Sequence, residues 1–317
     1  MPPREIEIVR RIENLWSSRR GTAVRLGIGD DTAAIRPPGA GREILLTTDQ
    51  VIENTHFGRR THPPRALGHK ILARGLSDIA AMGGRPLCFL LSLALPPWSS
   101  GAWLSAFVSG MFDLSQSSET PLVGGDVARG GHFAAAITVL GSAPAGRALT
   151  RAGARPGDVL YVSGQLGGSA LGLARMPKRQ TAPRTSRDSA VRRHLWPEPR
   201  LALGEFLRAR LGATAAMDVS DGLAMDLTRL AEASSVGAEI HAASIPLFPG
   251  ASLSQALHGG EDYELLFTLP RKIRPPRKFR KVPLTAIGRI RAKPGIDLVT
   301  SDRIEKLKPQ GYEHFPR

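Results

Sequence analysis

Aspartates in this sequence stand repeatedly at the ends of apolar runs, next to Gly, Ser or Thr residues. The set comprises Asp30 and Asp31 in GIGDDTAAI, Asp49 after Thr47 and Thr48, Asp126 after two glycines, and Asp218 and Asp221 around Ser220. Each one alone is typical of a turn or a helix N-cap. Because α/β folds bind ligands at strand ends and in the loops after them, the repetition indicates one shared site.

Asp78 is the clearest single case, because it lies in a segment with helical spacing, residues 63–84. The apolar stripe of this segment, with Asp78 at its edge, is formed by Leu67, Ile71, Ile79 and Met82. A carboxylate turned toward a core is costly unless it is paired or bound to a cation. Two interpretations stay open for Asp78, a metal ligand or an internal ion pair with an arginine such as Arg74.

Carboxylates that converge on one place repel one another unless cations neutralise them. Oxygen ligands without a His/Cys cluster favour Mg²⁺ over zinc, and the hydroxyls of Thr47, Thr48 and Ser220 can add neutral oxygens. Mg²⁺ usually completes its shell with water and substrate phosphates. Arg129 and Arg151 lie beside glycine turns and suit phosphate oxygens. The pattern therefore favours phosphoryl transfer from a nucleotide.

Familiar nucleotide-binding signatures are absent from the sequence. It contains no G-x-x-x-x-G-K-[ST] P-loop and no H-R-D or D-F-G kinase set. The glycine turn SGQLGGSA at 163–170 is by itself more typical of a structural turn than of a phosphate cradle. An ATP-using enzyme with this sequence must therefore belong to a different lineage.

Length, cysteine content and charge set further limits. The chain has 317 residues, enough for about two domains, and its single cysteine, Cys88, favours a reducing, cytoplasmic location. The net charge is +15, but aromatic residues make up only 5% and no nucleic-acid-binding motif is present. We expect no nucleic acid partner and, because the apolar run 87–95 is too short, no membrane span. A non-catalytic basic protein that binds polyanions stays open as an alternative.

Apolar periodicity and glycine or proline stop signals predict alternating strands and helices in both halves of the chain. Predicted strands in order are 42–49, 86–96, 120–126, 132–143, 158–164 and 213–220, followed by a turn and a strand within 259–270, and predicted helices are 63–84, 102–118, 167–176, 201–211 and 222–235. The alternation of strands and helices begins again after the segment GRALTRAGARPGD, residues 146–158. We therefore expect an α/β protein with two domains, residues 1–147 and 148–317.

Taken together, these motifs resemble those of the thiamine-monophosphate kinases, in the superfamily of aminoimidazole ribonucleotide synthetase and selenophosphate synthetase. The resemblance runs nearly end to end through GIGDDTAAI, LTTDQVIENTHF, LSDIAAMGGRP, LVGGDVARG, GRALTRAGARPGD, YVSGQLGGSALGL, MDVSDGLAMDL, GGEDYELLFT and GYEHF. It implies an N-terminal mixed sheet with helices that forms a barrel across a homodimer, and a sandwich-like C-terminal α/β domain. The implied reaction is phosphorylation of thiamine monophosphate by ATP, by direct in-line transfer.

The resemblance also implies roles for individual residues. Several Mg²⁺ ions would be held by Asp31, Thr47, Thr48, Asp49, Asp78, Asp126, Asp218 and Asp221. The nucleotide would contact Gly125, Asp126, Arg151 and Ser220, and the substrate would contact His56, Glu261 and Tyr312. Asp31 is favoured over its neighbour Asp30, a monovalent cation is an optional addition, and no general base is nominated because in-line transfer depends on positioning and charge neutralisation.

Some features depart from the family pattern. Gly75 stands where the family usually has Asn, Val127 and Ala128 replace two hydroxyl residues, and a short segment after 245–250 puts one expected helix in doubt. Another superfamily member is an alternative, but a selenophosphate synthetase would need a reactive cysteine in a glycine-rich loop. Cys88 lies instead in the apolar run PLCFLLSL.

Overall fold

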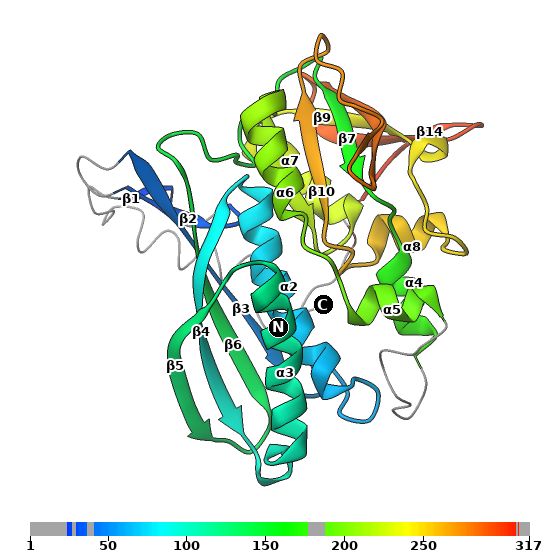
Figure 1. The fold of residues 1–317 in the computed structure, drawn as a ribbon. Helices are drawn as coiled ribbons and strands as arrows, with labels where there is room; N and C mark the ends of the chain where they lie inside the picture. Colours follow the sequence, from blue (N-terminus) through cyan, green and yellow to red (C-terminus); the bar gives the residue numbers. More distant parts are fainter. Residues whose placement is uncertain (1–23, 27–29, 37–40, 177–187, 309, 311–317) are drawn as a thin grey trace, which may run out of the picture.

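The structure is a computed structural model that describes residues 24–26, 30–36, 41–176, 188–308 and 310. Its described part contains two mixed β-sheets that lie side by side, with helices packed on and between them (Figure 1). The predicted α/β class is confirmed. The C-terminal segment with Tyr312 and much of the basic stretch 178–193 lie outside the described residues.

The first sheet has six strands in the order β1-β2-β3-β6-β4-β5, and only β4 and β5 pair in parallel. The strands are β1 (Val24–Leu26), β2 (Ala33–Ile35), β3 (Arg42–Ile52), β4 (Arg85–Leu95), β5 (Leu122–Arg129) and β6 (Ala134–Pro144). Sequence reading predicted β5 and β6 as strands joined by a glycine turn. Both are present, but β4 lies between them, because β4 pairs with each of them.

The second sheet has eight strands, of which seven follow the order β14-β13-β9-β12-β7-β10-β8 while β11 pairs with β12. The strands are β7 (Val159–Ser163), β8 (Ala215–Val219), β9 (Gly237–His241), β10 (Glu264–Leu269), β11 (Lys278–Phe279), β12 (Val282–Arg291), β13 (Gly295–Val299) and β14 (Ile304–Lys306). Strands β8 and β10 are buried along their whole length, including the charged residues Asp218 of β8 and Glu264 of β10.

Helices fill the space on and between the sheets. The α-helices are α2 (Pro64–Ala81), α3 (Ala102–Ser117), α4 (Gly168–Ala174), α5 (Ser189–Leu195), α6 (Leu201–Phe206), α7 (Leu223–Ala233) and α8 (Leu253–His258). Shorter turns are η2 (Pro97–Ser99), η5 (Ala242–Ser244) and a π-helical turn η4 (Leu207–Leu211) that continues α6. The doubt about a helix after residue 250 was unfounded, since Ser252 and Gln255 form a capping box that starts α8.

Helix α2 is the central element of the molecule. One side packs on the first sheet through Leu72, Leu76 and Ile79, and its C-terminal end packs against the second half of the chain through Ala80 and Ala81. Gly75 fits this position because a Cβ there would lie 2.6 Å from a methyl carbon of Val139. Any larger residue at position 75, Asn included, would push α2 away from β6.

Two glycines let α2 and α3 approach each other closely. A Cβ on Gly68 would lie 1.9 Å from the main-chain oxygen of Phe107, and one on Gly110 would lie 1.8 Å from that of Arg65. In both cases the added Cβ would meet a main-chain oxygen, so no change of side-chain rotamer can relieve the clash. No helix in the described ranges is long and apolar enough to cross a membrane.

We expect Gly68→Ala to lower the free energy of unfolding by about 1–3 kcal/mol, because the added methyl group forces the helices apart. Gly131→Ala is the matched control, since nothing lies within 4 Å of a Cβ at that exposed position. The control should stay within about 0.5 kcal/mol of the parent protein. Urea denaturation followed by circular dichroism measures both. Equal effects of the two substitutions would contradict the close packing of α2 on α3.

Candidate active site

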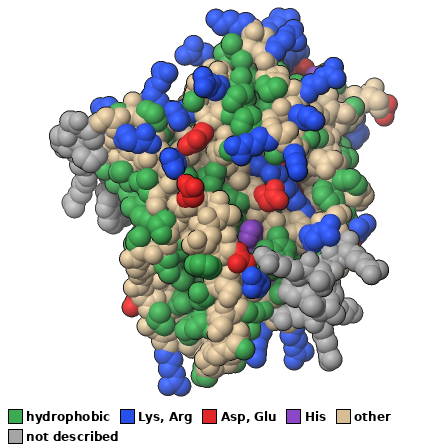
Figure 2. Space-filling view, viewed as in Figure 1, with side chains coloured by type: hydrophobic (Ala, Val, Ile, Leu, Met, Phe, Trp, Pro, Cys, Tyr) green, Lys and Arg blue, Asp and Glu red, His purple; other side chains and the backbone are tan. Residues whose placement is uncertain are grey.

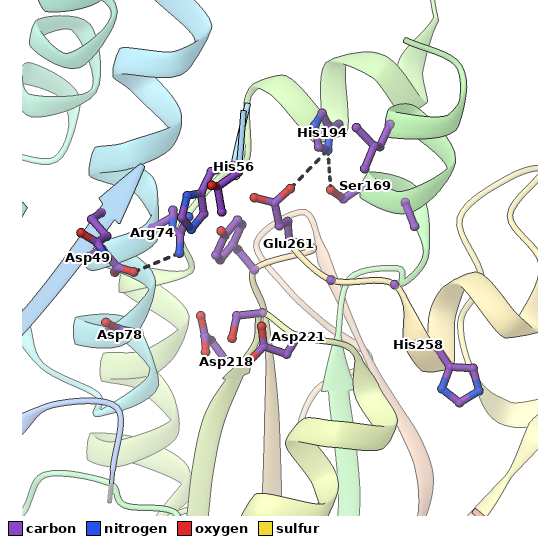
Figure 3. A pocket seen from close by; sticks show the side chains of 18 of the residues that line it. Asp49, His56, Arg74, Asp78, Ser169, His194, Asp218, Asp221, His258 and Glu261 are labelled. Carbon is purple, nitrogen blue, oxygen red and sulfur yellow. Dashed lines mark hydrogen bonds and ion pairs between the residues drawn. The ribbon is translucent and has the colours of Figure 1, made fainter. Parts of the chain in front are cut away.

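A cavity of about 840 Å³ lies where the two halves of the chain meet (Figure 3). Strand β3 contributes Asp49 to its lining, helix α2 contributes Asp78, and the end of β8 contributes Asp218. The segment between α8 and β10 adds Glu261. Residues that are far apart in the sequence therefore share one wall, which is the arrangement that the repeated aspartates predicted.

Three carboxylates converge at one end of this region. Asp31, Asp78 and Asp218 each offer a carboxylate oxygen, and these oxygens lie within 4.8 Å of one another. Burial, together with the negative charge of Asp31, raises the pKa of Asp218 to about 7. Burial and the neighbouring acids, Asp49 first, raise the pKa of Asp78 well above its usual value. The cluster is therefore electrostatically unfavourable without a cation.

The side chains of these three acids are held by different partners. Arg151 donates two hydrogen bonds to Asp31, at 2.9 and 3.3 Å, whereas Asp78 accepts one from the hydroxyl of Thr47. Ser77 donates a hydrogen bond of 2.7 Å to Asp218. Among the described residues, neither Asp78 nor Asp218 has an ion-pair partner. Their charge is therefore available to a cation.

The question of an Asp78–Arg74 ion pair is resolved by the position of the guanidinium. Arg74 pairs with Asp49, at 3.2 Å, rather than with Asp78 (Figure 3). Asp78 lies one helical turn further along α2 and faces the other acids. A carboxylate cluster of oxygen donors only, buried and mutually repelling, fits a hard divalent cation such as Mg²⁺.

Asp30 and Asp31, adjacent in sequence, have different surroundings. Asp30 accepts a hydrogen bond of 3.0 Å from the main-chain N–H of Arg151. Burial and the charge of Asp31 raise the pKa of Asp30 to about 7. Of these two aspartates only Asp31 belongs to the carboxylate cluster, and its role as a metal ligand stays a prediction.

The turn after β8 is fixed by an aspartate that sequence analysis passed over. Asp226 accepts hydrogen bonds of 3.0, 3.0 and 3.1 Å from the main-chain N–H groups of Ser220, Asp221 and Gly222. This holds Ser220 and Asp221 at the cavity wall, where Arg229 forms an ion pair with Asp221. The spacing of Asp226, four residues after Gly222 in the following helix, was the available signal.

At the other end of the cavity, a lysine, a glutamate and a histidine interact with one another. Lys70 donates a hydrogen bond of 2.7 Å to Glu261, and His194 lies 3.5 Å from the same carboxylate oxygen. Although burial opposes ionisation, the charge of Lys70 lowers the pKa of Glu261 to about 2. Burial and Lys70 also lower the pKa of His194 to about 3. Glu261 is thus an anion beside a neutral imidazole.

Two further predicted residues, Thr48 and His56, line the cavity. The ring Nδ1 of His56 accepts a hydrogen bond of 3.1 Å from the N–H of Ile52, so the opposite ring edge faces away from β3. The hydroxyl of Thr48 donates to the main-chain oxygen of Ile137 at 2.8 Å. Its oxygen keeps lone pairs for another ligand.

Gly125 and Asp126 are the predicted residues that the structure leaves apart from the cavity. They lie on β5, the exposed edge strand of the first sheet. The register places Gly125 in one row with Asp49, through Leu91 and Ile137, but three strand spacings of about 4.8 Å put roughly 14 Å between them. Within one chain, their predicted roles stay predictions.

Sequence analysis missed several polar residues of the cavity region. Lys70 was not singled out, Arg74 was considered only as a partner of Asp78, and Ser169 and His194 were left unassigned. Lys70, Arg74 and Asp78 are spaced by four residues, so they lie on one face of α2, and that spacing was a usable signal. His194 had none, because only the folded chain brings α5 against α2.

Two family models match the chain in succession. The N-terminal domain model of AIR synthase related proteins matches residues 29–143, and the C-terminal domain model matches residues 155–300. Apart from β1 and β14, the strands of both sheets fall largely within these matches, as do the residues that line the cavity. The chain belongs to the family of AIR synthase related proteins.

Individual relatives give more specific matches than the family models do. The chain is 39% identical over 322 residues to a thiamine-monophosphate kinase of Escherichia coli O157:H7, with 97% of each chain covered. It matches the structure described as AaThiL complexed with AMPPCP and TMP with a TM-score of 0.84 and 30% identity, covering 99% of both chains. The thiamine-monophosphate kinase of Stenotrophomonas maltophilia K279a matches with a TM-score of 0.75 and 36% identity, covering 92% of this chain and 95% of that one. The predicted family resemblance and two-domain fold are confirmed.

The raised pKa of Asp218 predicts a pH dependence for the metal-free protein. Its pKa is about 7 in the folded state against 3.8 ordinarily, so between these values the folded state keeps a proton that the unfolded state loses. Stability therefore falls as the pH rises through this range. We expect Asp218→Asn to raise the free energy of unfolding by about 1–3 kcal/mol at pH 8 and to change little at pH 4.

Urea denaturation in the presence of a chelator, at both pH values, checks this expectation. Asp302→Asn is the matched control, because Asp302 is exposed and does not line the cavity. Adding Mg²⁺ should stabilise the parent protein at pH 8 more than the Asp218→Asn variant. A variant that is less stable than the parent at pH 8 would show that Asp218 is already neutralised within the protein.

Proposed function

We propose that this protein phosphorylates thiamine monophosphate to thiamine diphosphate with ATP as the donor. The observation that carries the proposal is the convergence of carboxylate oxygens of Asp31, Asp78 and Asp218 beside the cavity that Asp78 and Asp218 line, in a chain 39% identical to a named thiamine-monophosphate kinase. The matched structure that holds AMPPCP and TMP has the same fold over nearly the whole chain. An ATP analogue and a phosphorylated substrate suit a cavity with an acidic end and a separate polar end.

The reaction asks little of a general base. The acceptor is a phosphate monoester oxygen, which is already ionised near neutral pH because its second pKa is about 6. As that oxygen bonds to the γ-phosphorus of ATP, the bond from this phosphorus to the β,γ-bridging oxygen breaks and ADP leaves. Two anionic groups must therefore be brought together, so positioning and charge neutralisation dominate the barrier.

The acidic end of the cavity would hold the metal ions. Asp31, Asp78 and Asp218 would bind Mg²⁺, with further oxygens drawn from Thr47, Thr48, Asp49 and Asp221. When bound, Mg²⁺ neutralises phosphate oxygens and the charge that develops during transfer. Arg151 fixes the carboxylate of Asp31 and adds a positive charge beside it. A monovalent cation is compatible with the surplus of acids.

The remaining predicted contacts divide between the nucleotide and the acceptor. Ser220, held by Asp226, would face the nucleotide together with Arg151 and the segment around Gly125. His56 and Glu261 line the wall away from the acid cluster and would contact the substrate. Tyr312 is proposed as a further substrate contact from the sequence motif alone.

The first sheet would serve as the interface of a homodimer. Its edge strand β5 is exposed along its whole length, and apolar side chains lie open on β4 and β5, among them Leu90, Leu122, Val123 and Val127. Hydrophobic side chains gather over this part of the molecule in Figure 2. Pairing two such sheets would cover these side chains and bring the partner's β5, with its Gly-Gly-Asp segment, toward the acid cluster. We also propose that the chain divides into two domains, residues 1–147 and 148–317.

The high positive charge favours no second function. Figure 2 shows Lys and Arg side chains scattered over the upper half and at the lower edge of the face drawn, between side chains of other kinds, rather than gathered into one band. Several arginines are also committed to internal carboxylates, including Arg151 and Arg200. The single cysteine and the use of ATP fit a cytoplasmic location.

The assay that tests the function measures ADP release from Mg²⁺-ATP with thiamine monophosphate, unphosphorylated thiamine and an unrelated phosphate monoester. We expect turnover with thiamine monophosphate only. Asp78→Asn should lower kcat by about 10²–10³-fold, because one charge that positions the metal and phosphates is removed. Asp302→Asn, at an exposed position, should leave kcat unchanged. Equal turnover of all three acceptors would refute the assignment.

A second test addresses the dimer. Val127 is 65% exposed on β5, so a charge there should not disturb the fold of the single chain. Val127→Asp should therefore leave the melting temperature of the single chain unchanged but separate the dimer into monomers. Light scattering after gel filtration should report the mass of one chain, and kcat should fall at least about tenfold if the partner's Asp126 completes the site. Val108→Asp, at an exposed valine of α3, is the matched control. A parent protein that is active as a monomer would refute the dimer.

A further inference from the structure

Helix α2 presents one charged side chain per turn along the wall of the cavity. Lys70, Arg74 and Asp78 are four residues apart, which places neighbouring members about 6 Å apart along the helix axis. Lys70 reaches Glu261, Arg74 reaches Asp49, and Asp78 belongs to the acid cluster. The row therefore runs from the end of the cavity that holds Glu261 to the end that would hold the metal.

Arg74, the middle residue of this row, lies where the acceptor phosphate of the substrate is expected. In the proposed reaction, the acceptor phosphate must touch the transferred phosphoryl group at the acid cluster. It must also remain joined to the organic part of the substrate near Glu261 and His56. The acceptor phosphate would therefore lie between the two ends, within one helical turn of Arg74.

The cavity offers this phosphate little other positive charge. Of the described residues that line the cavity, Arg74 is the only Lys or Arg. The amine of Lys70 is bound to Glu261 and its side chain is only 4% exposed, whereas that of Arg74 is 19% exposed. Burial and Lys70 lower the pKa of His194 to about 3, so that ring brings no charge. Arg74 is therefore the protein cation available to a phosphate dianion that enters beside Asp49, in addition to any bound metal.

We propose that Arg74 binds the acceptor phosphate of the substrate, and that its ion pair with Asp49 belongs to the state without metal. This inference rests on the proposed function. Once Asp49 contributes to binding a divalent cation, its charge is shared and the guanidinium can turn to the incoming phosphate. The planar fork of arginine donates two parallel hydrogen bonds to phosphate oxygens, which lysine cannot do. Arg74 would thus select phosphorylated over unphosphorylated thiamine.

Calorimetric titration of the whole protein tests this directly. Thiamine monophosphate and thiamine are titrated separately into the parent protein, Arg74→Gln and Arg74→Lys, each with Mg²⁺ and AMPPCP present. Hydrogen bonds to charged groups predict a loss of about 10- to 100-fold in monophosphate affinity for Arg74→Gln, with thiamine affinity unchanged. Arg74→Lys should lose less, because it keeps the charge. Arg65 lies on the same helix as Arg74 but pairs with Asp113 of α3, so Arg65→Gln should match the parent protein.

Three results would overturn the inference. Monophosphate affinity that is unchanged in Arg74→Gln, with tighter Mg²⁺ binding, would make Arg74 a counter-ion of Asp49 and nothing more. Equal losses of affinity for both ligands, in Arg74→Gln and in Arg74→Lys, would show that Arg74 maintains the structure of the cavity wall and does not bind the phosphate. A parent protein without turnover of thiamine monophosphate would remove the proposed function and this inference together, whereas turnover with no loss in Arg74→Gln removes the inference alone.

Discussion

Repulsion among buried carboxylates is the constraint on which this structure depends. Asp31, Asp78 and Asp218 bring oxygens within 4.8 Å of one another in a largely buried place, where burial and mutual charge raise the pKa of both Asp78 and Asp218. Such an arrangement lowers the stability of the folded protein unless a cation is bound there. The surrounding hydroxyls and arginines moderate the repulsion but leave Asp78 and Asp218 without directly paired cations in the described part of the chain. A cation bound among these carboxylates would remove this repulsion.

Helix α2 connects this constraint to the rest of the molecule. Its apolar residues belong both to the core under the first sheet and to the core shared with the second half of the chain. Glycines on α2, α3 and α6 allow main chains to touch, as where a Cβ on Gly204 would lie 1.9 Å from the oxygen of Ala80. Such packing leaves the helix little freedom to shift. The charged row of Lys70, Arg74 and Asp78 is consequently held on a rigid support, as precise phosphoryl transfer requires.

The two ends of the cavity use opposite electrostatic arrangements. At the acidic end, neighbouring carboxylates raise one another's pKa and favour a cation. At the other end, Lys70 keeps Glu261 ionised and His194 neutral. This difference gives the cavity two electrostatically distinct ends.

The sequence by itself determined the α/β class and the family resemblance, because apolar periodicity and short motifs are local properties. Positions at strand ends and on a helix singled out candidate ligands, namely Asp30, Asp31, Asp49, Asp78, Asp126, Asp218 and Asp221, and the resemblance favoured Asp31 over Asp30. Only the tertiary structure decided which charges pair: Arg74 with Asp49, Lys70 with Glu261, and His194 against both halves of the chain. It also placed β4 between β5 and β6 and left Asp126 on an exposed edge. Side-chain pairing depends on distances between segments far apart in the chain, and no local pattern encodes those distances.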